Sequence, residues 1–304
     1  PRVAVAIVVC ALVLMFLSVW DEAPIVDEIP HMGSGYSYVA KGDHRLNPEH
    51  PPLAKDLAGL GIALTRPTER AFATRFWNQD INGQWEFGRF LLFNSGSDTE
   101  RMVLFAKIPM FGFFILLCIL LFQWTTQLYG NRAALLALIL FAFSPTVLAH
   151  SRFVTTDVPA LFGVVLATYF FIHYLQKPSK KSLLLAGCMF GIAQLTKYSM
   201  FLLNPFFLCV GLAYGFVHPL RTGLKARLSR SFDFGFSTLI IILVGYVCIV
   251  WPYYIPHTWH YPPELQKYHT ETILETFGRR ELVDPVVFFS DKPIIRALAQ
   301  YGLG

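Results

Sequence analysis

Charged residues are scarce in this chain: they make up 15% of its 304 residues, whereas hydrophobic residues make up 54% and the mean hydropathy is +0.48. Soluble domains ordinarily carry about 25% charged residues, so this composition excludes a soluble globular protein. The apolar residues form runs of membrane-spanning length, since a hydrocarbon core of roughly 30 Å needs about 20 of them. The sequence therefore predicts a polytopic membrane protein.

Features typical of several other protein classes are missing. The net charge is +5, but the basic residues are scattered through short loops, without the continuous patch that binds nucleic acid. No internal repeat or low-complexity segment occurs. All five cysteines lie in apolar runs, where thiols behave as small hydrophobes, so no disulfide framework is predicted. The first apolar run ends without a small-residue cleavage pattern, which favours a retained span over a signal peptide.

Seven apolar runs are predicted to be spans. They cover about residues 3–20, 102–122, 133–148, 158–175, 183–195, 200–217 and 236–254. The fifth and sixth runs could merge into one helix, but together they are too long for one crossing, and Lys197 between them marks a turn at the water. We expect an all-α polytopic membrane protein of about seven transmembrane helices with a long helical first loop at 21–101.

The lysines and arginines of the short loops predict the orientation. Placing Arg2 in the cytoplasm also places two basic clusters and Arg132 there. The clusters are Lys177, Lys180 and Lys181, and Arg221, Lys225, Arg227 and Arg230. The short loops opposite hold only Arg152 and Lys197. This orientation puts the first loop, the turn 150–157, the turn at Lys197 and the tail from residue 256 on one exoplasmic face.

Aromatic and basic residues alternate in the second half of the first loop. Between residues 72 and 93 they are Phe76, Trp77, Trp85, Phe87 and Phe90, with Arg75 and Arg89. This mixture is typical of a helix that lies in the headgroup layer. The alternative is a small soluble subdomain with the same aromatics packed inward, but about eighty residues form only a marginal core.

An acidic pair, Asp27 and Glu28, follows the first span. Adjacent residues on a helix point about 100° apart, so one would act on a substrate while the other holds a basic neighbour. The alternative is a solvated acidic loop. Asp157 precedes Val158 and Pro159 and is predicted to cap the fourth span. A second role remains open to it, because His150 and Arg152 share its turn.

Two further patterns carry alternatives. Lys197 could be a snorkelling surface lysine, but a lysine opposite the basic loops runs against the positive-inside bias, which favours a function. Three histidines, His31, His44 and His50, lie near Asp43 and Glu49 and suggest zinc. Their spacing matches no compact zinc motif, so a divalent metal is not favoured and no cofactor is predicted.

Four motifs occur in order along the chain: the Asp27-Glu28 pair, His-Pro-Pro-Leu-x-Lys at 50–55, Ser-Pro to Thr-Asp-x-Pro at 144–159, and Leu-Thr-Lys-Tyr-Ser at 195–199. The chain thereby resembles the polyprenyl-phosphate-sugar-dependent membrane glycosyltransferases, that is, the protein O-mannosyltransferases and the lipid A aminoarabinose transferases. The resemblance covers essentially the whole chain. It departs from the family at Lys107, where an arginine is expected.

The resemblance implies a membrane module at 1–255, with a catalytic first exoplasmic loop at 21–101, and an exoplasmic tail at 256–304. The family continues into further spans, so we expect a truncated chain. It implies an inverting glycosyltransferase in the plasma or inner membrane, with its active site on the exoplasmic or periplasmic face. The partners would be a polyprenyl-phosphate sugar, an acceptor hydroxyl on a protein, lipid or glycan, and the bilayer, but no nucleic acid.

A sugar on a polyprenyl phosphate is already activated, so the enzyme needs a carboxylate to accept the hydroxyl proton and positive charge to stabilise the leaving phosphate. By resemblance Asp27 is the general base, Glu28 orients it or holds a basic group, and Asp157 positions a cation. The phosphate candidates are His50, Lys55, Arg152 and Lys197; the candidate donor or acceptor contacts are His31, His150, Tyr198 and His257.

A transporter or lipid-handling protein is the alternative function. It predicts charged residues near mid-span and broken helices in paired halves. Here the charges stand at helix ends and no repeat is visible, which favours the enzyme.

Overall fold

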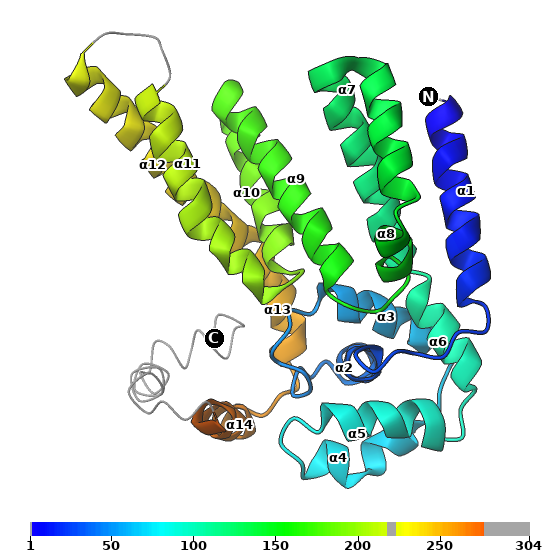
Figure 1. Cartoon of the computed structure of the whole chain (residues 1–304). Helices are drawn as coiled ribbons and strands as arrows, with labels where there is room; N and C mark the ends of the chain where they lie inside the picture. Colours follow the sequence, from blue (N-terminus) through cyan, green and yellow to red (C-terminus); the bar gives the residue numbers. More distant parts are fainter. Residues whose placement is uncertain (1, 218–222, 277–304) are drawn as a thin grey trace.

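The computed structural model describes residues 2–217 and 223–276, which fold into helices and connecting turns without strands. One group of helices runs side by side as a bundle, and a second group of shorter helices covers one end of it, called here the capped end (Figure 1). The bundle consists of α1 (Arg2–Val19), α7 (Met110–Ala142), α9 (Asp157–Gln176), α10 (Lys180–Gln194), α11 (Leu203–Val217) and α12 (Leu224–Gly245).

The remaining helices lie at or near the capped end. In chain order they are α2 (Glu28–Lys41), α3 (Leu53–Leu64), η1 (Glu69–Ala73), α4 (Arg75–Asn78), α5 (Gln84–Arg89), η2 (Phe90–Asn94), α6 (Thr99–Lys107), α8 (Pro145–His150), η3 (Tyr198–Leu202), η4 (Tyr246–Val250), α13 (Trp251–Thr258) and α14 (Pro263–Thr276). The helices from α2 to η2 form the predicted helical first loop.

Five helical stretches of the described residues are long and apolar enough to cross a membrane, so the chain is an all-α polytopic membrane protein. They are Arg2–Val19, Thr99–Ala142, Asp157–Gln176, Tyr198–Val217 and Leu224–Thr258. The second stretch, Thr99–Ala142, folds back at Gly130 (Figure 1). The φ of Gly130 is 83°, which glycine adopts without strain. The two arms on either side of Gly130 correspond to the predicted runs 102–122 and 133–148. The run at 183–195 forms α10, whose 15 residues fall below the length of a full span.

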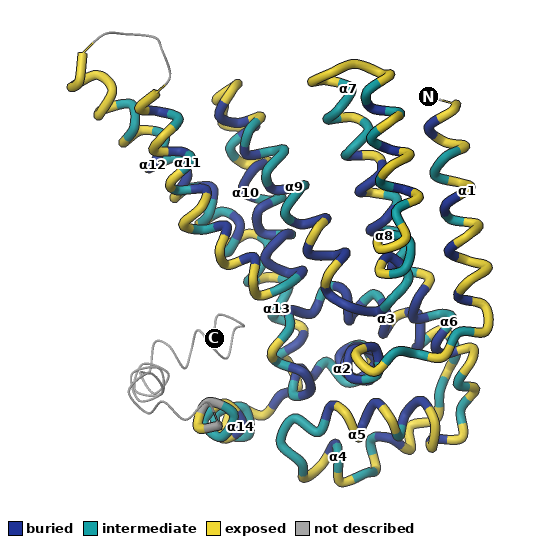
Figure 2. The backbone as a smooth tube through the Cα atoms, viewed as in Figure 1, coloured by how far each residue is buried: buried dark blue, intermediate teal, exposed yellow. Residues whose placement is uncertain are grey.

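Exposed apolar residues lie along the bundle, as expected for helices surrounded by lipid. On α1 they include Val5, Val9, Val13 and Leu17. Buried residues gather where the bundle meets α2 and α3 (Figure 2). The bundle and the first loop therefore share their best-packed region.

The aromatic residues of the first loop pack mostly inward, as the alternative of a packed subdomain expected, and the location of this segment in the headgroup layer stays a prediction. Trp77 and Phe87 are buried in one core with Ala58 of α3 and Phe113 of α7, whereas Trp85 is 42% exposed. The loop does not need a core of its own, because the ends of the spans supply part of its apolar surroundings. This removes the argument against inward packing.

The elements that carry the predicted site meet at the capped end. The end of α1, the start of α9 and the α10–α11 connection all lie there, whereas the turn at Gly130 and the α9–α10 connection, with Lys177, lie at the opposite end (Figure 1). Arg221 and residues 277–304 of the predicted tail lie outside the described residues. The predicted domain boundary at residue 255 falls inside α13 and stays a prediction.

Candidate active site

Asp27 and Glu28 stand at the start of α2 and point to different surroundings, as their adjacency on a helix requires. Glu28 is fully buried, and its carboxylate accepts hydrogen bonds from the backbone N–H groups of Val154 (2.8 Å) and Ile25 (2.9 Å). Asp27 is exposed and occupies the N-cap position of α2 without capping it through its side chain. Asp27 is therefore the member of the pair that can face a substrate.

Glu28 belongs to a chain of ion pairs that ties the first loop to the end of α6 and to the turn before α9. Lys107 is buried and lies 3.2 Å from Glu28 and 2.9 Å from Glu22, and Glu22 lies 2.8 Å from Arg152. Burial raises the pKa of Glu28 above its usual value, while the charge of Lys107 opposes this shift. Glu28 thus holds a basic neighbour, which is one of the two roles predicted for it.

Arg152 was predicted to bind the donor phosphate, but its guanidinium is engaged within the protein. It pairs with Glu22 and donates a hydrogen bond to the carbonyl oxygen of Ser18 at 3.1 Å. A phosphate at Arg152 would have to compete with this carboxylate. Sequence reasoning did not single out Glu22, although an acidic residue two positions after a span is the same kind of signal that identified Asp27.

Asp157 and Lys197 form an ion pair of 2.8 Å between the start of α9 and the α10–η3 turn. Their side chains are 56% and 32% exposed, so a ligand can reach both. The capping prediction was wrong by one residue: Thr156 occupies the N-cap position, and Asp157 is the first residue of the helix. The carboxylate of Asp157 instead contacts a cation, as the positioning role requires.

His31 of α2 and His50 of the loop before α3 lie edge to face, with ring centroids 5.1 Å apart. Burial, with the nearby charges of Lys55 and Lys197, lowers the pKa of His31 to about 3 and also lowers the pKa of His50. The Nδ1 atoms of both rings are buried without a hydrogen-bond partner among the described residues. Both rings are therefore neutral near pH 7, and a neutral imidazole still offers one N–H donor.

The histidines and the Asp157–Lys197 pair lie together. The hydroxyl of Tyr198 donates to the carbonyl oxygen of Pro48 at 2.7 Å, which joins the turn of Lys197 to the loop of His50. The histidine–lysine cluster consists of His31, His50, Asp157, Lys197 and Tyr198. Asp27 precedes His31 by four residues in helical geometry, so the two side chains share one face of α2.

Lys55 was predicted to bind the donor phosphate, but its ammonium is engaged within the protein. It is fully buried, and its ammonium donates to the Tyr38 hydroxyl (2.8 Å) and to the carbonyl oxygens of Asn47 (2.6 Å) and His50 (2.7 Å). Burial lowers its pKa well below the usual value. Because an ammonium has three N–H donors, Lys55 has none left for a phosphate and instead fixes the loop that carries His50.

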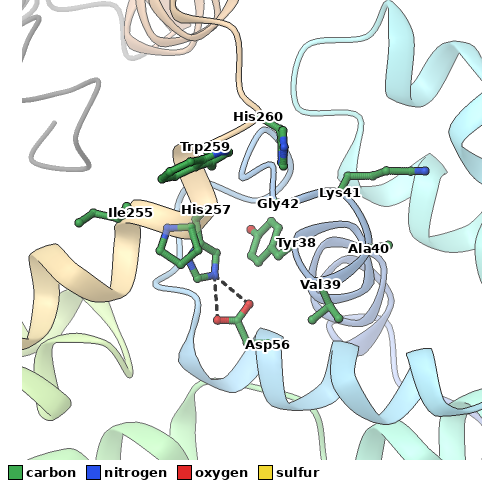
Figure 3. A pocket seen from close by; sticks show the side chains of 11 residues that line it. Tyr38, Val39, Ala40, Lys41, Gly42, Asp56, Ile255, His257, Trp259 and His260 are labelled. Atoms are coloured by element: carbon green, nitrogen blue, oxygen red, sulfur yellow. Dashed lines mark hydrogen bonds and ion pairs between the residues drawn. The ribbon is translucent and has the colours of Figure 1, made fainter.

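His257 is linked to the cluster through Tyr254, since their ring centroids lie 6.1 Å apart and Tyr254 makes a side-chain hydrogen bond with Tyr198. The Nε2 of His257 is 2.8 Å from the Asp56 carboxylate, and together they line a cavity of about 570 Å³ beside Trp259 and His260 (Figure 3). Tyr38 lines the same cavity and accepts a hydrogen bond from Lys55, which also donates to the carbonyl oxygen of His50. The Asp56 partner was not anticipated, since only the fold brings residues so distant in sequence together.

His150 is not brought to the cluster by a contact. Its ring is exposed, with Nδ1 2.9 Å from the carbonyl oxygen of Thr146 in its own helix. In the described ranges no three metal-ligating side chains gather into a group that could hold a metal ion. The prediction that no metal takes part stays a prediction.

Comparison with known proteins gives a family match over residues 92–251, to the family described as dolichyl-phosphate-mannose-protein mannosyltransferase. This region includes Asp157 and Lys197 and begins after Asp27. One curated relative, Dolichyl-phosphate-mannose--protein mannosyltransferase 1 of Saccharomyces cerevisiae, is 26% identical over 187 residues, which are 59% of this chain and 20% of the relative. The match thus spans about a fifth of the relative's length. No solved structure matches the chain.

Proposed function

The chain belongs to the dolichyl-phosphate-mannose-protein mannosyltransferase family, and from this premise we propose that it transfers a sugar from a polyprenyl-phosphate donor to an acceptor hydroxyl. The family match and the apolar helices support a membrane glycosyltransferase. The donor, the acceptor and the membrane face are parts of the proposal. The acceptor class we favour is a protein hydroxyl, in line with the name of the relative.

One observation carries the proposal: an exposed carboxylate, Asp27, shares a helix face with His31, and His31 belongs to a cluster that contains an accessible cation, Lys197, at the ends of apolar helices. A lipid-linked donor would keep its tail between the spans and its phosphate at this level. Charged side chains are costly at the depth of the membrane. A charged substrate that binds there explains why this protein has them.

These residues can carry out each part of the sugar transfer. The acceptor oxygen attacks the anomeric carbon of the sugar, the bond from that carbon to the phosphate oxygen breaks, and the configuration inverts. Asp27 accepts the hydroxyl proton as general base. The phosphate leaves with the bonding electron pair, and Lys197, positioned by Asp157, stabilises its charge, with His50 offering a hydrogen bond. No general acid is needed, because phosphate is already a stable anion.

The membrane face follows from the distribution of basic residues. The α9–α10 connection holds Lys177 and leads into Lys180 and Lys181, and it lies at the end opposite the cluster. Basic loops remain in the cytoplasm in most membrane proteins. The cluster is therefore proposed to face the exoplasmic or periplasmic side of the plasma or inner membrane.

The test is Asp27→Asn in the full chain, reconstituted with a polyprenyl-phosphate sugar and an acceptor peptide. The amide keeps the size of the side chain but cannot accept the proton, so we expect the rate of sugar transfer to fall by at least about a hundredfold. Asp21→Asn is the matched control, because Asp21 is another exposed acid near the end of α1. If Asp27→Asn transfers sugar as fast as Asp21→Asn, Asp27 is not the base.

A further inference from the structure

Three polar side chains from three different helical segments meet inside the apolar bundle near its capped end. The Tyr246 hydroxyl donates to Gln194 Oε1 at 3.2 Å and accepts from Asn204 Nδ2 at 3.1 Å. Gln194 ends α10, Asn204 lies in the first turn of α11, and Tyr246 begins η4. Polar groups among apolar spans are costly, so such a group calls for a functional explanation.

This group, called here the polar triad, is bonded to the turn that carries Lys197. Gln194 Nε2 donates to the carbonyl oxygen of Met200 at 3.0 Å, and the N–H of Met200 donates to the carbonyl oxygen of Lys197 at 3.0 Å. Asn204 Nδ2 also donates to the carbonyl oxygen of Phe201 at 2.8 Å. The triad thus anchors the backbone that directly follows Lys197, at Met200 and Phe201.

Close packing of α10 against α12 brings Tyr246 to Gln194. Gly191 of α10 and Gly245 of α12 pack so closely that a Cβ on Gly191 would lie 2.6 Å from the carbonyl oxygen of Gly245. Gln194 follows Gly191 by one helical turn, and Tyr246 follows Gly245 directly. The π-helical segment η4 starts at Tyr246, and π-helical segments inside helices often occur at functional sites.

The turn is held at its outer side as well. Lys197 Nζ lies 2.8 Å from Asp157, and the Tyr198 hydroxyl bonds to Pro48 of the first loop. One hydrogen bond, from Gln194 Nε2 to the carbonyl oxygen of Met200, already closes the turn across Lys197. The two bonds of Tyr246 join η4 to Gln194 and Asn204, the two side chains that hold the backbone after Lys197.

We propose that Gln194, Asn204 and Tyr246 are positioning residues that hold Lys197 in place for the phosphate of the donor. This inference rests on the proposed function, in which Lys197 contacts the leaving phosphate. None of the three side chains contacts the substrate. Their effect therefore passes through Lys197 and shows itself in the use of the donor, while the use of the acceptor is unaffected.

Tyr246→Phe removes only the hydroxyl and tests this inference in the full chain. We expect KM for the polyprenyl-phosphate sugar to rise about threefold to tenfold and KM for the acceptor peptide to stay unchanged, while the unfolding temperature falls because Gln194 and Asn204 lose a partner. Tyr169→Phe is the matched control, because Tyr169 of α9 makes a hydrogen bond of 3.0 Å with Gln127 of α7, also between two bundle helices. Equal donor KM values in the two variants would overturn the inference.

A double variant separates this inference from the proposed function. If Tyr246 acts through Lys197, Tyr246→Phe changes the donor KM in the wild-type background and leaves it unchanged in a Lys197→Ala background. Additive effects would contradict the inference alone. If Lys197→Ala by itself leaves the donor KM unchanged, the phosphate role of Lys197 fails and the positioning role fails with it.

Discussion

The ammonium of Lys107 lies 3.2 Å from the carboxylate of Glu28, and both side chains are completely buried. The pair joins the end of α6 to the start of α2, and so it fixes the segment from which Asp27 projects. Two backbone N–H groups on the same carboxylate complete its surroundings. This arrangement makes Glu28 a supporting residue and leaves the exposed Asp27 for the chemistry.

Lys107→Met tests the support. Removing one partner of a buried ion pair leaves an uncompensated charge, which typically costs about 3 to 5 kcal/mol of unfolding free energy. We expect a large fall in the thermal unfolding temperature, and partial recovery when Glu28→Gln is added, since the neutral amide no longer needs the cation.

Lys41→Met is the control for this substitution, because the Lys41–Glu69 pair is partly exposed, at 34% and 72%. Exposed pairs contribute at most about 1 kcal/mol. Equal destabilisation by Lys41→Met and Lys107→Met would show that the buried pair does not support α2.

The burial of His31 leads us to predict that the free energy of unfolding depends on pH. Its pKa in the folded protein is about 3, against an ordinary value of 6.5, because burial disfavours the charged ring. Between these two values the unfolded state binds a proton that the folded state does not, so stability falls as the pH falls from 6.5 towards 3. Above pH 6.5 the residue has no effect.

His31→Gln should remove this dependence. By pH 4.5 we expect the wild type to lose about 2 to 3 kcal/mol more than the variant, as measured by denaturant unfolding at several pH values in detergent micelles. His150→Gln serves as the control, since that ring is exposed. A His31→Gln variant that loses as much stability as the wild type would contradict the burial of a neutral ring.

Asp157→Asn separates stability from function. The Asp157–Lys197 pair is partly exposed, so its loss should change the unfolding free energy by less than about 1 kcal/mol. The lysine would lose its orienting partner, and we expect the donor KM to rise at least about threefold. Glu69→Gln breaks a comparably exposed pair away from the cluster and should leave the donor KM unchanged; a rise equal to that of Asp157→Asn would remove the positioning role.

The membrane architecture and the gathering of charges could be predicted because both depend on coarse patterns. Apolar runs and the bias of basic residues determine which loops share an end, and this was enough to bring Asp157 and Lys197 together. The adjacency of Asp27 and Glu28 predicted different tasks for the two acids, with a basic neighbour as one option for Glu28, whereas the burial of Glu28 comes only from the fold. The structure agrees with these predictions through contacts between residues far apart in the sequence.

Other features could not be predicted, because they arise from tertiary packing. Helix α2 has a sequence of low helix propensity, with Gly33, Ser34 and Gly35 in succession, and it is helical because it packs against α3 and α5. Lys55 resembles a surface lysine in the sequence, and only the fold surrounds it with acceptors. Arg152 was a phosphate candidate because its turn shares a face with the other cations, and its ion pair with Glu22, which is distant in sequence, could not be predicted.

The central claim is that Asp27 and Lys197 act on the same bound donor, one on the chemistry and the other on the phosphate. Equilibrium binding of the polyprenyl-phosphate sugar to Asp27→Asn and Lys197→Ala proteins in nanodiscs tests it most directly, when combined with a single-turnover assay. We predict that Asp27→Asn binds the donor with the wild-type Kd and transfers no sugar, whereas Lys197→Ala binds it at least about tenfold more weakly. Wild-type affinity in Lys197→Ala together with normal transfer by Asp27→Asn would contradict the claim.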